Sequence, residues 1–398
     1  MEFANIADYR AAARRFLPSF AFAYLEGGSE DEITLRRNRR AFERVMFAPR
    51  VLVDVSTVST TATLAGCAAA WPAVVGPTGL NGLYRREAEE ILARAAGAAG
   101  LPFVLSTAST SLLEDVRKAS DGELWLQLYV QKDRRIAEDM MARARASGFS
   151  TLLLTVDTPV TGQRDHYVRT GFKLPLRWTR QLLWDIATHP RWIAAVGVHG
   201  VPQLVNLARS ARLESGIEAQ AAALSRQMDM SLNWDDLAWV RRHWPGKLFV
   251  KGIQTVADAV TASRQCVDGV VLSNHGGRQL DGALSSMDIL ADTVSSTPAG
   301  FEVLIDGGIR RGSDIAKAVA LGAKGVLLGR APLYGLAGAG ESGVNDVLSM
   351  LRNELEICLR LLGCPDIGSL DVSYLVGERE SRIGAIQQED AETMEIKL

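Results

Sequence analysis

A histidine and an arginine three residues apart are well suited to chemistry on a small acid. His275 and Arg278 stand in the run 273–279 (SNHGGRQ), which follows the apolar stretch 269–272. An imidazole can exchange a proton near neutral pH, and a guanidinium can bind a carboxylate through two parallel hydrogen bonds. The two glycines allow a sharp turn and a close approach of the backbone to a ligand. The run predicts proton transfer on a small carboxylic acid, with a hydrogen-bonded structural histidine as the alternative.

Polar side chains also follow other short apolar segments of the chain. We expect eight strands, at residues 72–76, 102–106, 124–129, 151–155, 247–251, 269–273, 302–306 and 325–329. Helical periodicity lies between several of them, at 87–99, 135–147 and 313–321. Apolar strands that alternate with helices indicate a parallel sheet buried on both faces. Eight such units predict an α/β fold, a (β/α)8 TIM barrel with an N-terminal helical extension and a long insertion after strand 4.

The residues that follow the eight strands are expected to meet in one place, because barrel enzymes carry their sites at the carboxyl ends of the strands. The last two strand ends combine glycines with arginines, which suits a phosphate. Since His275 and Arg278 would serve a smaller anion, that phosphate should belong to a cofactor. The candidates are Pro77, Thr78, Gly79, Ser106, Gln127, Tyr129, Thr155, Asp157, Lys251, Ser273, His275, Arg278, Asp306, Gly307, Gly308, Ile309, Arg310, Gly329 and Arg330.

Composition narrows the class of protein. The 398 residues are 47% hydrophobic, enough for a large core, and a net charge of −2 argues against a nucleic-acid partner. The four cysteines show neither paired spacing nor a histidine at metal-ligand spacing, so we expect reduced thiols and no metal. The apolar stretch 16–25 is interrupted by Pro18 and lacks a cleavage site, so no signal peptide is expected. No apolar run approaches the ~18 residues of a membrane span.

These motifs resemble those of the FMN-dependent α-hydroxy-acid oxidising family, which includes glycolate oxidases, L-lactate dehydrogenases and mandelate dehydrogenases. The most specific run is 273–279, and the runs 306–312 (DGGIRRG) and 124–130 (LWLQLYV) reinforce it. The similarity extends from 24–28 (YLEGG) to about residue 375. It implies one FMN-binding domain over 1–376 that oxidises a 2-hydroxy acid to a 2-keto acid. The charged tail 377–398 would be either mobile or an oligomer contact.

The resemblance also implies roles for the candidates. His275 would act as base, and Asp157 would orient its ring; whether the C2 proton or the hydroxyl proton is removed stays open. Lys251 would stabilise the anionic reduced flavin, and Tyr129 would lie near the substrate hydroxyl. The flavin ring would be held by Ser106, Gln127, Thr155, Lys251, Ser273 and the backbone of Pro77, Thr78 and Gly79, and the ribityl phosphate by Asp306, Gly307, Gly308, Ile309, Arg310, Gly329 and Arg330.

In the same resemblance, Arg164, Arg278 and the hydroxyl of Tyr24 would bind the substrate carboxylate. Family members for small acids often carry an aromatic residue at the position of Ala108, and true oxidases tend to carry alanine at that of Gly79. The wider pocket suits a bulky acid such as (S)-mandelate, giving benzoylformate, unless another loop fills it. An L-lactate dehydrogenase and an O2-using oxidase stay open. Rivals of other classes are a flavin-free phosphate-binding barrel isomerase or lyase and a membrane-surface scaffold.

The insertion after the fourth strand concentrates positive charge. Residues 171–212 hold six Lys or Arg residues and one acid, so this segment carries +5 and the rest of the chain −7. Trp178, Trp184 and Trp192 lie among apolar residues beside these charges, which predicts a segment on an anionic membrane surface. Bacterial dehydrogenases of the family dock on the cytoplasmic side of the inner membrane through this loop and reduce quinone, often as tetramers or larger rings. A lid packed on the barrel, with tryptophan in the core, is the alternative.

Overall fold

The computed structural model describes residues 3–171, 179–200, 202–211 and 228–376. At its centre eight parallel strands close into a barrel, in the order β10-β11-β4-β5-β6-β7-β8-β9. Each strand overlaps its predicted segment, so the (β/α)8 prediction is confirmed. The strands are β4 (Ala73–Val75), β5 (Phe103–Ser106), β6 (Leu124–Leu128), β7 (Thr151–Thr155), β8 (Lys247–Ile253), β9 (Gly269–Leu272), β10 (Glu302–Asp306) and β11 (Gly325–Leu328).

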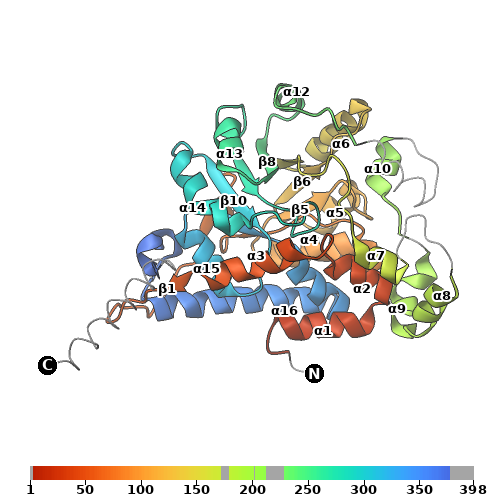
Figure 1. Cartoon of the computed structure of the whole chain (residues 1–398), viewed down its shortest axis with the longest axis horizontal. Coiled ribbons are helices and arrows are strands. Elements are labelled where there is room, and N and C mark those ends of the chain that lie inside the picture. Colours follow the sequence, from red (N-terminus) through yellow and green to blue (C-terminus); the bar gives the residue numbers. More distant parts are fainter. Residues whose placement is uncertain (1–2, 172–178, 201, 212–227, 377–398) are drawn as a thin grey trace, which may run out of the picture.

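Helices surround the barrel and return the chain from the end of one strand to the start of the next, as in βαβ units (Figure 1). The periodic segments predicted as helices correspond to α4, α6 and α15. The surrounding helices are α4 (Ala88–Ala98), α5 (Leu113–Ala119), α6 (Arg134–Ala146), α12 (Asp236–His243), α13 (Val256–Ser263), α14 (Ser286–Ser296), α15 (Gly312–Ala320) and α16 (Arg330–Leu362).

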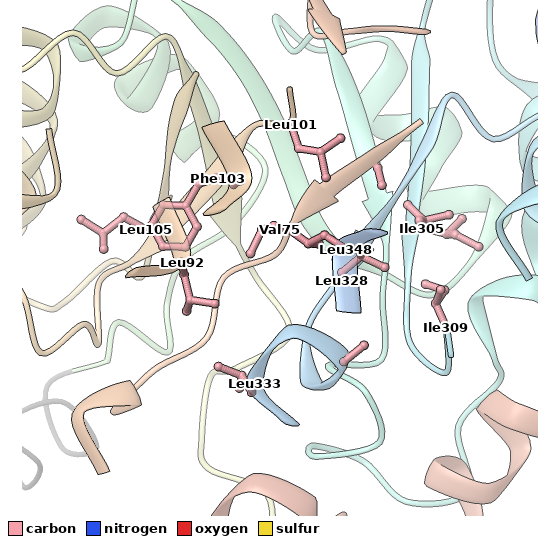
Figure 2. Packing of buried hydrophobic residues seen from close by; sticks show 14 of the residues in the cluster. Val75, Leu92, Leu101, Phe103, Leu105, Ile305, Ile309, Leu328, Leu333 and Leu348 are labelled. Atoms are coloured by element: carbon pink, nitrogen blue, oxygen red, sulfur yellow. The ribbon is translucent and has the colours of Figure 1, made fainter. Parts of the chain in front are cut away.

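Neighbouring residues of a strand face opposite sides of the barrel wall. Val74 and Val104 belong to the cluster inside the barrel, where the rings of Trp125 and Phe249 stack 6.3 Å apart. The residues next to these in each strand point outward and pack against the helices in a second, outer cluster. Figure 2 shows part of this outer cluster: the strand residues Val75, Phe103, Leu105 and Leu328, together with Leu348 from α16. Because both faces of each strand are buried, the strands read as continuous apolar runs rather than as alternating ones.

A hairpin of β2 (Ala62–Leu64) and β3 (Cys67–Ala69) lies at the amino-terminal end of the barrel. Its turn residues, Ala65 and Gly66, both have positive φ (50° and 80°), as a tight two-residue hairpin turn requires. The Ala65 amide donates to a carboxylate oxygen of Glu302, the first residue of β10 (2.9 Å), and Leu64 packs inside the barrel. Since the hairpin covers this end, the opposite, carboxyl end is left for a ligand.

The N-terminal extension consists of α1 (Ile6–Phe16), α2 (Ser19–Glu26) and α3 (Ile33–Glu43). The Asn5 side chain caps α1 by accepting from two backbone amides, and Pro18 separates α1 from α2. In Figure 1, α1 lies along α16, far from it in sequence. Near the other end of the described chain, β12 (Leu375–Val376) pairs antiparallel with β1 (Met46–Phe47).

The described part of the insertion forms α7 (Asp165–Thr170), α8 (Arg180–Ala187), α9 (Pro190–Ala195), the 3-10 turn η2 (Gly197–His199) and α10 (Val205–Ser210). The prediction of surface tryptophans holds for Trp184, which is 73% exposed, but is wrong for Trp192, which is 6% exposed. Trp192 packs edge-on against Phe20 of α2 and donates its indole N–H to the Leu83 carbonyl (2.8 Å), so it belongs to the core. The predicted surface residues Lys173, Arg177, Trp178 and Arg212 and the tail 377–398 lie outside the described residues.

The end of the insertion is bonded to the barrel. The buried Asn206 amide of α10 donates to Ser109 Oγ (2.8 Å) and to the Ser111 carbonyl (2.9 Å), and its oxygen accepts from the Leu113 amide (3.2 Å). The neighbouring Leu204 is buried as well. Within the described ranges, no helix is both long and apolar enough to cross a bilayer.

Candidate active site

A cavity of about 410 Å³ lies at the carboxyl ends of the barrel strands, within the size range of small-molecule sites. The residues predicted from the strand ends all line it except Asp157 and Ser273. These two lie directly behind it, hydrogen-bonded to His275 and Lys251 respectively. Arg164 and Tyr24, from outside the strand ends, also line the cavity. The structure therefore brings together the residues that the sequence placed on eight separate strands.

His275, which is partly exposed to the cavity, pairs with the buried side chain of Asp157. Nδ1 of His275 lies 3.0 and 3.2 Å from the two carboxylate oxygens of Asp157, whose side chain is 2% exposed. Burial raises the pKa of Asp157, but the charges of His275 and Lys251 outweigh that effect and lower the pKa to about 2. An ionised carboxylate only accepts hydrogen bonds, so Nδ1 must carry the hydrogen and Nε2 is left as the basic atom. Nε2 lies 3.3 Å from the hydroxyl of Tyr129.

The backbone conformation of residues 275–277 places the His275 side chain next to Asp157. His275 has φ of +59°, and Gly276 and Gly277 follow at +63° and +76°, so three consecutive residues are left-handed. This conformation is uncommon for a residue with a side chain and occurs where the surrounding structure enforces it, often at functional sites. The His275 amide donates to Ser273 Oγ (3.0 Å). On the other side Gly252 has φ of +110°, and a Cβ there would lie 2.7 Å from Asp157 Cβ, so only glycine leaves room for this carboxylate.

A chain of polar groups runs along the strand ends on one side of the cavity. Ser106 donates to the Gln127 side-chain oxygen (2.9 Å), and the Gln127 amide donates to Thr155 Oγ1 (2.9 Å). Lys251 Nζ, paired in register with Thr155, lies 2.9 Å from Ser273 Oγ and 3.0 Å from Asp306 Oδ2.

Lys251 is a cation despite its complete burial. Burial by itself lowers the pKa of Lys251, but the carboxylates of Asp306 and Asp157 raise it above its ordinary value. The structure thus fixes a positive charge at the edge of the cavity, between Ser273 and Asp306.

The ends of β10 and β11 form a cradle for an anion. Gly307 and Gly308 have φ of +94° and +86°, and a Cβ on Gly308 would lie 2.4 Å from the Asn38 carbonyl oxygen. Gly329 caps α16, whose first residue is Arg330, so the amino end of this helix reaches the cavity. The free N–H groups and the dipole of a helix N-terminus favour phosphate. Arg310 lines the cavity beside them.

The Arg330 side chain is already bonded to the protein. Its guanidinium donates to the carbonyls of Leu25 (3.1 Å), Gly27 (3.0 Å) and Gly276 (2.8 Å), so it joins the N-terminal extension to the His275 loop. Burial, and to a lesser degree the charges of Arg278 and Arg310, lower the pKa of Arg330 to about 10. A bound dianion nearby would favour the charged form of Arg330.

A phosphate-bearing flavin fits this arrangement. Within the described ranges, Asp306 Oδ1 is buried and has no hydrogen-bond partner, so it can accept from a ligand hydroxyl. The glycine cradle and Arg310 suit the phosphate, and the Gln127, Thr155 and Lys251 groups suit the polar edge of a ring. In the same part of the chain, no group of three or more His, Cys, Asp or Glu side chains is placed to hold a metal ion.

Another part of the cavity lining combines two arginines with aromatic rings. Arg278 donates to the Tyr24 carbonyl (2.7 Å) and lies over the Tyr24 ring, 5.0 Å from its centroid. Arg164 donates to the Arg278 carbonyl (3.2 Å). Two guanidiniums beside the basic Nε2 of His275 can hold a carboxylate while a proton is removed next to it.

An apolar wall completes the cavity. Gly79 and Ala108 face each other, and a Cβ on Gly79 would lie 3.0 Å from that of Ala108. Leu204, just before α10, and Met228, directly after the undescribed residues 212–227, also line the cavity. The insertion therefore contributes apolar side chains to the same cavity as Ala108.

Sequence reasoning missed several residues of this site. Gln279 donates to the carbonyls of Asp157 and Val160 (3.0 Å each), and Tyr167 contacts both arginines. Gly252 could have been noticed, because a glycine directly after the strand-end Lys251 suggests close packing. Gln279 ends the run 273–279, so its place in that motif could have pointed to it. Tyr167 gave no such signal, since Arg278, one of its two arginine partners, is 111 residues away.

A profile of the FMN-dependent dehydrogenase family matches residues 13–377. The chain therefore belongs to this family. It is 48% identical over 374 residues to (S)-mandelate dehydrogenase of Pseudomonas putida, across 94% of each chain. It is 42% identical over 381 residues to L-lactate dehydrogenase of Caulobacter vibrioides, across 96% of this chain and 99% of the relative. A crystal structure of the monotopic membrane protein (S)-mandelate dehydrogenase matches with a TM-score of 0.91 and 48% identity, across 95% of this chain and 100% of that one.

FMN is thus the cofactor of this dehydrogenase, and the flavin-free isomerase or lyase considered above is excluded. The family match also agrees with the fit of a phosphate-bearing flavin to the cradle at the ends of β10 and β11.

Proposed function

We propose that this FMN-dependent dehydrogenase oxidises (S)-mandelate to benzoylformate. The observation that carries the proposal is the placement of His275 Nε2, held by the ionised Asp157, in one cavity with Arg164, Arg278 and the flavin cradle. When bound, FMN supplies the two-electron acceptor. The guanidiniums would bind the substrate carboxylate together with the Tyr24 hydroxyl. The Tyr129 hydroxyl would lie near the substrate hydroxyl.

In this proposal His275 accepts the proton that the substrate releases. Asp157 stabilises the imidazolium that forms, because its charge lies 3.0 Å from Nδ1. The fixed charge of Lys251 would favour negative charge on the flavin.

We assign the flavin ring to the polar strand ends and its phosphate to the amides at the start of α16 and beside the Gly307–Gly308 turn. Arg310 would supply the side-chain cation, since its guanidinium donates to one carbonyl, that of Ile309 (2.8 Å), and at 3.4 Å to the Tyr334 hydroxyl. Arg330 would contribute its amide, since its guanidinium donates to three carbonyls. The ring-binding residues would be Pro77, Thr78, Gly79, Ser106, Gln127, Thr155, Lys251 and Ser273, and the phosphate-binding and ribityl-binding residues Asp306, Gly307, Gly308, Ile309, Arg310, Gly329 and Arg330.

The apolar wall supports an aromatic rather than a small substrate. Ala108, Leu204 and Met228 offer apolar surface to a phenyl ring, which lactate lacks. L-Lactate is the second candidate, because the related L-lactate dehydrogenase is 42% identical.

Anaerobic mixing of the purified holoenzyme with each acid tests the substrate. We expect (S)-mandelate to bleach the flavin absorption with a larger kcat/KM than L-lactate, and (R)-mandelate to react far more slowly. Faster reduction by L-lactate would favour the second candidate. A protein that no 2-hydroxy acid reduces would overturn the proposal. Comparing peroxide formation with reduction of a quinone analogue separates oxidase from dehydrogenase behaviour.

We propose further that the protein binds the cytoplasmic face of the inner membrane peripherally, reduces quinone there and assembles as a homotetramer or larger. The related (S)-mandelate dehydrogenase is a monotopic membrane protein. On α8 of this chain Leu183 is 51% and Trp184 73% exposed, and the exposed Arg180 and Arg191 lie nearby in sequence. Exposed apolar groups flanked by cations suit an anionic lipid surface.

Point substitutions test this surface better than removal of 177–212, because Leu204 lines the cavity and Asn206 bonds to the barrel. The double variant Leu183→Gln, Trp184→Gln should lose binding to vesicles that contain anionic lipid while flavin reduction stays unchanged. The matched control is Leu361→Gln, which changes a leucine of α16 that is 73% exposed. Equal vesicle binding by both variants would contradict the proposal.

A further inference from the structure

Tyr167 of α7 connects the two arginines assigned to the substrate carboxylate. Its hydroxyl oxygen accepts a hydrogen bond from Arg278 Nη2 at 2.7 Å and another from Arg164 Nη1 at 2.9 Å. The Arg164 guanidinium also lies over the Tyr167 ring, 5.2 Å from its centroid. Two guanidiniums repel each other, so the shared oxygen holds together two charges that would otherwise separate.

The two arginines depend on Tyr167 to different degrees. Arg278 is also held by the carbonyls of Tyr24 (2.7 Å) and Gly27 (3.2 Å). The other hydrogen bonds of Arg164 are longer, at 3.2 Å to the Arg278 carbonyl and 3.4 Å to the Gln279 side-chain oxygen. Because hydrogen bonds weaken as they lengthen, the Tyr167 hydroxyl is the main fixed point for Arg164.

Tyr167 is also held by contacts other than those to the two arginines. Its ring lies 5.7 Å from the Tyr24 ring, and α7 packs on α2 of the N-terminal extension. The preceding His166 lies 3.0 Å from a carboxylate oxygen of Glu32, which joins α7 to the segment before α3. Tyr167 is therefore placed by packing and can impose its position on the two guanidiniums.

We infer that Tyr167 is a positioning residue that aligns Arg164 and Arg278 for the carboxylate of the substrate. The inference rests on the proposed oxidation of a 2-hydroxy acid and adds a residue to its carboxylate site. It also predicts which class of ligand needs Tyr167 for binding. Carboxylates should depend on the hydroxyl, whereas uncharged amides of the same acids should not, because they do not need both cations.

Tyr167→Phe tests the inference, because it keeps the ring packing and removes the shared acceptor. We expect KM for (S)-mandelate to rise about tenfold and kcat to change less than about threefold, the KM effect being that of one lost hydrogen bond to a charged group. KM for mandelamide should stay unchanged. The matched control is Tyr9→Phe, which removes a hydroxyl that donates to Asp346 Oδ2 (2.6 Å) between α1 and α16. That variant should lower the Tm without moving KM.

A double-mutant cycle with Arg164→Met shows whether Tyr167 acts through Arg164. If it does, the double variant should raise KM much less than the product of the two single effects. A multiplicative effect, an unchanged KM for mandelate in Tyr167→Phe, or an equal rise for mandelamide would overturn the inference.

Failure of the proposed function would be visible separately. It would appear as a wild-type flavin that no 2-hydroxy acid reduces. In that case the flavin spectral change on binding phenylacetate still tests Tyr167. Weaker binding in Tyr167→Phe than in Tyr9→Phe would support its role in holding a carboxylate, and equal binding would refute that role.

Discussion

Asp157→Asn should slow flavin reduction strongly while FMN stays bound. In the wild type, the surroundings lower the pKa of Asp157 from 3.8 to about 2. At 1.36 kcal/mol per pKa unit, this shift corresponds to about 2.5 kcal/mol of favourable interaction of the carboxylate, net of its burial. His275 is the larger source of that interaction and Lys251 the smaller. The amide keeps the shape of the carboxylate but removes its charge.

The expected loss follows from the proton transfer. The imidazolium of His275 forms as the substrate proton leaves, and without the Asp157 charge it is destabilised by roughly the same free energy. If most of that charge has developed in the transition state, reduction should slow by roughly 30- to 100-fold. The measurement is anaerobic stopped-flow reduction of the flavin at saturating (S)-mandelate, together with the FMN content of the purified variant.

Asp268→Asn is the matched control. Asp268 makes ion pairs with Arg241 (2.8 Å) and Lys247 (2.9 Å), residues outside the cavity lining. This variant should lose stability but reduce its flavin at the wild-type rate. If Asp157→Asn also reduced its flavin within about threefold of wild type, the role of Asp157 in stabilising the imidazolium would be refuted.

The same pKa predicts a pH dependence of stability. A carboxyl group whose pKa is lowered by folding stabilises the native state above its unfolded pKa, here 3.8. The contribution declines as the pH falls through the folded value of about 2. The difference in unfolding free energy between wild type and Asp157→Asn should therefore be at its full value near pH 5, about 2 kcal/mol in order of magnitude, and vanish between about pH 4 and 2. Denaturant titrations at several pH values check this, and a difference that grows in acid would contradict the sign.

Three further substitutions address other parts of the site. His275→Ala should retain FMN and carboxylate binding but lose roughly 10²- to 10⁴-fold in flavin reduction; near wild-type reduction would exclude His275 as the base. Lys251→Met should lower the Tm and the FMN affinity, because the partly buried Asp306 carboxylate loses its charge partner, at a cost of up to about 3–5 kcal/mol; calorimetry and FMN titration measure both. Ala108→Phe should fill space beside Gly79 and lower the mandelate-to-lactate ratio of kcat/KM at least about tenfold, and an unchanged ratio would remove Ala108 from the aromatic pocket.

Local sequence was sufficient to predict the barrel and much of the site. A strand buried on both faces has a short, continuous apolar sequence. Segments such as 269–273 were therefore recognisable without knowledge of the strands that pair with them. Parallel topology then places every carboxyl end on one face, which is why residues such as Gln127, Lys251 and Asp306 could be assigned to one cavity. The pairing of Asp157 with His275 was implied by the resemblance, and the structure places the two side chains in contact.

Tertiary structure decided what no local pattern contains. Trp184 and Trp192 have similar sequence surroundings, yet one is exposed and the other packs on Phe20, because α9 lies against the N-terminal extension. Tyr167 reaches Arg278, 111 residues away, through the packing of α7 on α2. Strand identity and strand-end chemistry are encoded over a few residues, so the sequence determined them by itself. Which guanidinium remains available to a ligand and which tryptophan is buried depend on distant segments that meet only in the folded chain.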